Sequence, residues 1–141
     1  MRLLKKGKYQ VIFPSNIKYL PEAEHITACI SKELAFDEDA RDDLSIAITE
    51  LFNNALHHGN KEDESKKITI TFTVLGEGLQ ISVQDEGKGF KPEKIKNPLD
   101  KENILKTSGR GLFLVEQLVD KICFNVSQKG SEVIVFKKFN K

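Results

Sequence analysis

The hydrophobic positions in the first third of the chain form two helical stripes. Pro21 opens the segment PEAEHITACISKELAF, whose apolar residues recur at the three- and four-residue spacing of an amphipathic helix. Proline suits the first helical turn, where its missing N–H group costs nothing. We expect a second helix to begin near Asp37–Asp39, because acidic side chains favour a helix N-terminus, and Gly59 can end it. The apolar stripe of this second helix comprises Ala40, Leu44, Ala47, Ile48, Leu51 and Ala55.

The remaining periodic segments predict mostly strands. KYQVIFPS is a short strand-like run, and ITITFTVL alternates and is β-branched, which is typical of a strand. GEG predicts a turn, so LQISVQD is the expected partner strand of a hairpin. RGLFLVEQLVDKI predicts a helix, and CFNVSQKGSEVIVFKKF predicts two strands around a Lys-Gly turn. The predicted fold class is therefore an α/β (α+β) two-layer sandwich, with helices on one face of a mixed, mostly antiparallel sheet.

One long segment has no periodicity. Between Gly87 and Gly109 the chain is rich in Gly, Pro, Lys and Asn. A loop of this length inside a compact domain is usually functional or mobile. There is no internal repeat and no linker, so we expect residues 1–141 to form a single domain.

Composition excludes few functions. The hydrophobic fraction of 39% and the charged fraction of 30% are ordinary for a soluble globular protein. Lys plus Arg number 22 against 21 Asp plus Glu, and this balance argues against direct nucleic-acid binding. The polar N-terminus MRLLKKGKYQ and the lack of a membrane-spanning apolar run predict a cytoplasmic protein that does not contact a membrane. Cys29 and Cys123 lie in apolar surroundings, so we expect buried free thiols.

The second predicted helix carries an unusual number of polar side chains in the segment ELFNNALHHGN. With a rotation of about 100° per residue, Glu50, Asn54 and His58 fall beside the apolar stripe. Asn53 and His57 point further toward solvent. A buried polar group without a partner costs about 1–3 kcal/mol. These residues therefore form either a plain polar helix edge or the lining of a cleft. A metal site at His57 and His58 is disfavoured, because adjacent helical side chains do not converge.

Two glycine motifs come after this helix. In QDEGKGF, Asp85 ends a predicted strand and precedes Gly87 and Gly89. The aspartate could simply start a turn. Alternatively, it could accept a hydrogen bond from an exocyclic amine, while the glycines let a flat ring approach the backbone. In TSGRGLFLV, a glycine pair precedes a helix; this is either an ordinary junction or an anion site of backbone N–H groups assisted by Arg110.

The order of these motifs resembles a known ATP-binding fold. An E-x-x-x-N-A-x-x-H-G helix, a D-x-G-x-G strand end and a G-x-G helix start resemble the Bergerat-type fold of gyrase, heat-shock chaperones, histidine kinases and mismatch-repair ATPases. There is no Walker A pattern, so the phosphate site differs from a P-loop. FPSNIKYLPEAEHITACI and GRGLFLVEQLVD are similar to the first and last parts of bacterial anti-sigma factor serine/threonine kinases.

The resemblance implies a role for each motif residue. Glu50 would be the general base, Asn54 would coordinate Mg²⁺ bridging the ATP phosphates, and Asp85 would read the adenine amine. An ATP lid would span about residues 87–109. The further nucleotide-binding residues implied by the resemblance are His58, Gly87, Gly89, Thr107, Ser108, Gly109, Arg110, Gly111 and Leu112.

The resemblance also implies a function. The protein would be an ATP-dependent anti-sigma factor that phosphorylates a small anti-anti-sigma partner of the STAS type, sequesters a sigma factor and forms a homodimer through its N-terminal strand and first helix. One alternative is a nucleotide-dependent binding module without phosphotransfer, although a pure binder has no need of Glu50 as a base. Another is a catalytic domain serving a histidine kinase in trans, but the chain has no phospho-accepting helix pair. A domain with no ligand would require three motifs to coincide by chance.

Overall fold

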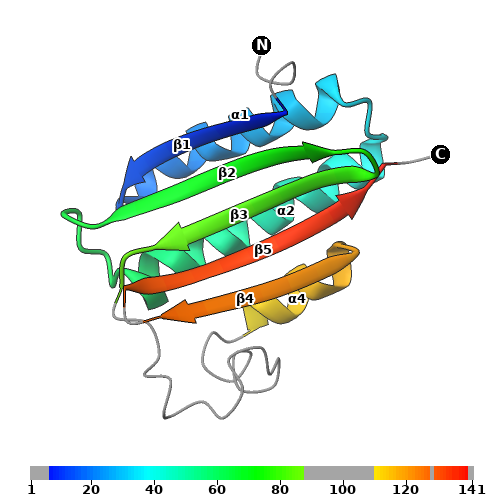
Figure 1. Ribbon diagram of the computed structural model, residues 1–141. Helices are drawn as coiled ribbons and strands as arrows, with labels where there is room; N and C mark the ends of the chain where they lie inside the picture. Colours follow the sequence, from blue (N-terminus) through cyan, green and yellow to red (C-terminus); the bar gives the residue numbers. More distant parts are fainter. Residues whose placement is uncertain (1–6, 88–109, 128, 140–141) are drawn as a thin grey trace.

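The computed structural model describes residues 7–87, 110–127 and 129–139 (Figure 1). The elements in chain order are β1 (Lys8–Pro14), η2 (Ile17–Tyr19), α1 (Leu20–Glu33), α2 (Glu38–Asn54), η3 (Ala55–Gly59), β2 (Lys67–Leu75), β3 (Gly78–Asp85), α4 (Arg110–Leu118), β4 (Lys121–Ser127) and β5 (Gly130–Lys138). Of these, η2 is a 3₁₀ turn and η3 is a π-helical turn. Within these ranges, no helix is long and apolar enough to cross a membrane.

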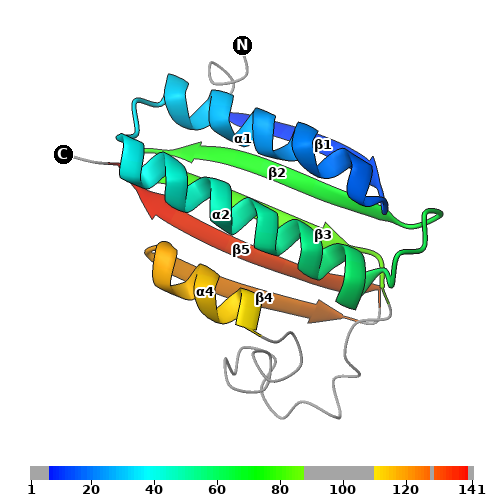
Figure 2. The ribbon, with the colours of Figure 1, turned by 180° about the vertical axis from the view of Figure 1, so that it is seen from behind.

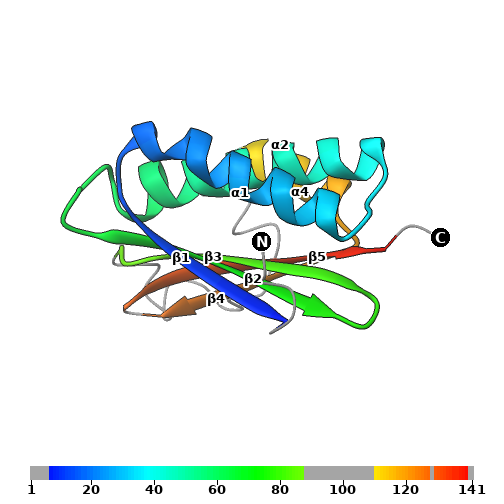
Figure 3. The same cartoon turned by 90° about the horizontal axis from the view of Figure 1, so that it is seen from above.

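The strands form one sheet in the order β1-β2-β3-β5-β4. Every pairing in the described part is antiparallel, so the predicted mixed sheet is wholly antiparallel there. Helices α1, α2 and α4 lie together on one face, with α2 in the middle (Figure 2). The edge-on view shows two layers, and none of the described helices lies on the other face of the sheet, which is the uncovered face (Figure 3). The predicted two-layer sandwich is confirmed.

Alternation along the strands decides which side chains enter the core. In β2, Ile68, Ile70 and Phe72 are buried, while the threonines between them lie on the uncovered face. These residues belong to one apolar cluster with the stripe of α2, which includes Leu44 and Leu51. The predicted stripe is thus the surface that joins the two layers.

The junction between α1 and α2 obeys local rules. The Ala35 N–H donates to Lys32 O at 3.0 Å, and the Phe36 N–H donates to Ser31 O at 3.1 Å. This is a Schellman motif, and it places Ala35 in the left-handed region with φ of 62°. The Asp37 side chain then caps α2 by accepting the Ala40 N–H at 2.8 Å. The predicted start of the second helix near Asp37–Asp39 is confirmed.

The last helix is shorter than its sequence pattern predicts. RGLFLVEQLVDKI indicated a helix through Ile122, but α4 ends at Leu118 and β4 begins at Lys121. The Asp120 N–H donates to Phe136 O at 2.9 Å, and Asp120 Oδ2 accepts the Lys138 N–H at 2.7 Å. Pairing with β5 therefore overrides the helical periodicity after Leu118.

Both cysteines are free thiols, as expected, but neither is fully buried. Cys29 is half-buried, and Cys123 is exposed. Phe124 takes the inward position in β4, so its neighbour Cys123 faces outward by the two-residue strand period. The prediction that Cys123 is buried was wrong because apolar neighbours in the sequence do not show which face of a strand is covered.

Candidate nucleotide-binding site

Two polar residues lie near the C-terminal end of α2, and one of them, Glu50, lies beside the start of α4. Glu50 and Asn54 are both half-buried, as predicted for the rim of the apolar stripe. A Cβ atom at Gly111, the second residue of α4, would lie 2.7 Å from Glu50 Oε2. The backbone of α4 therefore packs directly against the Glu50 carboxylate, and glycine is the residue that leaves this space.

Asn54 holds an oxygen that is suited to a ligand. Its Oδ1 atom is buried and has no hydrogen-bond partner among the described residues. An unpaired buried carbonyl costs about 1–3 kcal/mol, which a bound cation can offset. Hard cations such as Mg²⁺ prefer oxygen ligands of this kind. Asn54 therefore fits the role of a metal ligand.

The helix changes its winding immediately after Asn54. In the π-helical turn η3, the Asn60 N–H donates to Ala55 O, five residues earlier, at 2.8 Å. This extra residue per turn rotates the later side chains, so His58 does not share the half-buried position of Asn54 and is exposed. The predicted placement of His58 was wrong because it assumed regular α-helical steps, and its contact with the nucleotide remains a prediction. His57 is also exposed, as expected, with Nδ1 3.5 Å from Glu62 Oε2.

Asp85 lies at the end of β3 with its carboxylate firmly held. The residue is only 3% exposed. Its Oδ1 accepts the Gly87 N–H at 3.0 Å and the Ser131 N–H at 3.2 Å, and its Oδ2 accepts the Ser131 hydroxyl at 2.7 Å. A carboxylate can accept about four hydrogen bonds, so one acceptor position is left for a ligand amine.

Two glycines bring the end of η3 against the end of β3. A Cβ atom at Gly59 would overlap the Asp85 carboxylate, and one at Gly87 would overlap Gly59 O. Only residues without side chains allow this approach. It places Asp85 beside the turn that comes after Asn54, so the first two motifs meet in one site.

The third motif is described only in part. The backbones of Arg110, Gly111 and Leu112 form the first turn of α4. The Leu112 side chain is 1% exposed in the core, so only its backbone N–H could reach a phosphate. The candidate residues Gly89, Thr107, Ser108 and Gly109, and the lid apart from Gly87, lie outside the described residues.

The structure adds two polar residues that the sequence analysis did not identify. Ser131 occupies an inward position of β5, two residues before the buried Val133, where strand alternation could have indicated an unusual polar group. Asn60 lies in the connector after η3 and is 1% exposed. No periodic signal covers that connector, so no local pattern indicated its burial.

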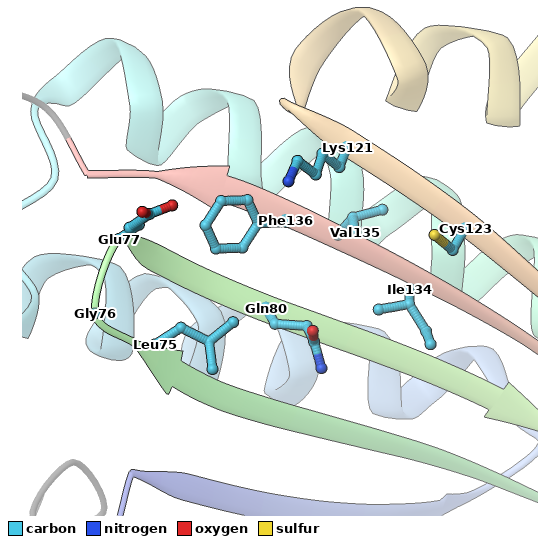
Figure 4. Close-up of a pocket in the computed structure, with 9 residues that line it drawn as sticks. All are labelled: Leu75, Gly76, Glu77, Gln80, Lys121, Cys123, Ile134, Val135 and Phe136. Atoms are coloured by element: carbon cyan, nitrogen blue, oxygen red, sulfur yellow. The ribbon is translucent and has the colours of Figure 1, made fainter.

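A separate groove lies on the uncovered face of the sheet (Figure 4). Its volume is about 360 Å³. It is lined by Leu75, Gly76, Glu77, Gln80, Lys121, Cys123, Ile134, Val135 and Phe136. The β2–β3 turn borders this groove, whereas Asp85 lies at the opposite end of β3 and faces the helices. The groove is therefore distinct from the candidate site.

Comparison with known proteins agrees with this geometry. Residues 13–137 match the family described as the histidine kinase-like ATPase domain. The serine-protein kinase RsbW of Oceanobacillus iheyensis is 29% identical over 130 residues, which cover 88% of this chain and 82% of that protein. Its namesake from Bacillus mycoides is 30% identical over 139 residues, which cover 94% of this chain and 86% of that protein.

A solved structure supports the fold. The structure of the RsbU and RsbW domains of a Mycobacterium tuberculosis protein aligns with a TM-score of 0.71 at 18% identity, over 95% of this chain and 33% of that one. At this identity the likeness concerns the fold alone. The chain belongs to the histidine kinase-like ATPase domain family and, within it, to the serine-protein kinases named RsbW.

Proposed function

We propose that this protein is an ATP-dependent kinase that phosphorylates a serine or threonine on a small anti-anti-sigma protein of the STAS type and also sequesters a sigma factor. Membership of a family of serine-protein kinases supports the reaction class. The observation that carries the proposal is the gathering of Glu50, Asn54 and Asp85 around the C-terminal end of α2 and η3.

Asp85 would bind the adenine end of ATP. Its three hydrogen bonds to Gly87 and Ser131 orient the carboxylate and leave one acceptor position. The exocyclic amine of adenine is a donor that matches this position. Guanine has a carbonyl oxygen there instead, so the site would favour ATP over GTP.

Asn54 would bind Mg²⁺ through its unpaired Oδ1 atom. When bound, the metal would neutralise charge on the phosphates and favour their transfer. The N-terminal backbone of α4, including Gly111, would donate N–H groups to the same phosphates.

Glu50 would act as the general base. Its carboxylate would take the proton of the acceptor hydroxyl, whose oxygen forms a bond to the γ-phosphorus. The bond from that phosphorus to the β–γ bridging oxygen breaks in line, and ADP leaves. Gly111 is consistent with this role, because a larger residue at the start of α4 would press against Glu50 Oε2.

We also propose a homodimer formed through β1 and the start of α1. β1 is an edge strand of the sheet. Ile12 and Ile17 nearby are 52% and 50% exposed, which is high for aliphatic side chains. The protein would act in the cytoplasm, where sigma factors meet RNA polymerase.

Labelled ATP, Mg²⁺ and candidate acceptor proteins test the proposal directly. The wild type should label one of them, whereas Glu50→Gln should transfer about 10²- to 10⁴-fold more slowly, the usual contribution of a general base. Glu50→Gln should still bind ATP. Glu38→Gln, an exposed glutamate in the first turn of the same helix, is the control and should transfer normally. Equal transfer by Glu50→Gln and wild type would exclude Glu50 as the base.

The labelling experiment, combined with sigma-factor binding in ATP and in ADP, distinguishes the kinase from the alternative function. A wild type that transfers no phosphate, yet binds a sigma factor differently in ATP and ADP, would be a nucleotide-dependent binding module. In that case Glu50→Gln should leave partner binding unchanged.

A further inference from the structure

Asn60 is a buried amide that joins three strands. It is 1% exposed, although it lies in a connector and not in a helix or strand. Its Nδ2 donates to Ser15 Oγ at 2.7 Å and to Lys67 O at 2.9 Å. Its Oδ1 accepts the Glu86 N–H at 2.8 Å. One side chain therefore ties together the end of β1, the start of β2 and the residue directly after β3.

The backbone around Asn60 adopts a costly conformation. The next two residues, Lys61 and Glu62, have φ of 52° and 61°. Non-glycine residues in this left-handed region cost about 1–2 kcal/mol each. Such strain persists only where the surroundings determine the conformation, and it concentrates at functional sites. The bond from the Glu62 N–H to Leu56 O, at 2.7 Å, holds the connector to η3.

Asn60 also links the two ends of the candidate site, which are the Asn54 end and the Asp85 end. Its own N–H closes the π-helical turn on Ala55, the residue after Asn54. Its Oδ1 holds the N–H of Glu86, the residue after Asp85. Ser131 restrains the Asp85 carboxylate from β5, whereas Asn60 restrains the backbone next to it from η3.

We propose that Asn60 is a positioning residue that orients Asp85 for recognition of the adenine amine. It acts through the Glu86 N–H and does not touch the nucleotide. This inference rests on the proposed function, because it requires Asp85 to bind the base. Its consequence is specific: loss of the Asn60 side chain should weaken base recognition more than phosphate transfer.

Asn60→Ala tests the inference, with Ser15→Ala as the matched structural control. Ser15→Ala removes one partner of the amide but leaves the Glu86 bond in place. Asn60→Ala should raise the Kd for ATP by about tenfold, on the scale of one hydrogen bond to a charged group, and reduce the preference for ATP over GTP. Its rate at saturating ATP should stay within about twofold of the wild type, since Glu50 is untouched. Ser15→Ala should keep the base preference of the wild type.

Asn60→Asp keeps the inference testable if the alanine variant does not fold. The aspartate retains an acceptor for the Glu86 N–H but presents a second acceptor to Lys67 O. It should lose stability and keep the preference for ATP. In the wild type without nucleotide, the Glu86 amide should exchange hydrogen slowly, because Asn60 holds it.

The outcomes separate the inference from the proposed function. A wild type that binds no adenine nucleotide in calorimetry overturns both. If the wild type prefers ATP, this inference alone is overturned by a folded Asn60→Ala variant that keeps the full preference for ATP over GTP. A folded Asn60→Asp variant that loses that preference also overturns this inference alone. Rapid exchange of the Glu86 amide in the wild type would also overturn it.

Discussion

The substitution Asp85→Asn tests whether this carboxylate reads the base. Asparagine has nearly the same shape, and its carbonyl can occupy the Oδ1 position, where it keeps the bonds from the Gly87 and Ser131 N–H groups at 3.0 and 3.2 Å. Its NH₂ group then takes the Oδ2 position and can donate to Ser131 Oγ once that hydroxyl rotates. The local hydrogen bonds therefore survive. The group offered to a ligand changes from an acceptor to a donor.

The expected loss comes from that change. A hydrogen bond to a charged group contributes about 1.5–3 kcal/mol, so the Kd for ATP should rise about 10- to 150-fold. The Kd for ADP should rise by a similar factor, because the base is the same. Guanine presents a carbonyl oxygen where adenine has its amine. The substitution should therefore weaken the binding of GTP less than the binding of ATP, or should strengthen it.

Isothermal titration calorimetry with Mg²⁺ and ATP, ADP or GTP measures these changes. Thermal unfolding checks that the variant is folded. Glu86→Gln is the control, because Glu86 is the adjacent carboxylate but is exposed. A folded Asp85→Asn variant that binds ATP within twofold of the wild type would remove Asp85 from the base pocket and refute the reasoning.

Three further predictions concern stability and the metal. Ala35→Gly should raise the free energy of unfolding by about 0.5–1 kcal/mol, because glycine relieves the strain of the left-handed φ of 62°. Ala28→Gly, inside α1, should lower the free energy of unfolding by about 1 kcal/mol. Urea unfolding measures both changes, and equal effects of the two substitutions would contradict strain at Ala35. Asn54→Ala should slow Mg²⁺-dependent phosphate transfer by at least about 100-fold, the scale of one transition-state contact. It should not lower the unfolding temperature, because the oxygen that it removes is buried and unpaired. Normal transfer would exclude Asn54 as the metal ligand. Lys137→Met should cost about 1–2 kcal/mol in urea unfolding, because Lys137 Nζ bonds to Asp43 Oδ2 at 3.0 Å and to Leu118 O at 2.7 Å; an unchanged midpoint would show that this half-buried link contributes nothing.

The fold was largely predictable because most of its elements arise from local patterns. The stripe of α2 and the alternation of β2 name the buried residues correctly. The errors occur where distant parts of the chain compete with the local pattern. α4 stops at Leu118 because β5 pairs with the residues directly after it, and Cys123 is exposed because nothing covers that face of β4 in the described part of the chain.

The sequence by itself determined the three motifs and the rim position of Glu50 and Asn54, because helical and strand periods relate residues a few positions apart. Only the tertiary structure decided how Asp85 is held. Ser131 bonds to it from 46 residues away, and Asn60 reaches Ser15 across 45 residues and Glu86 across 26. Such contacts depend on how the sheet and η3 are brought together, and no local spacing encodes them.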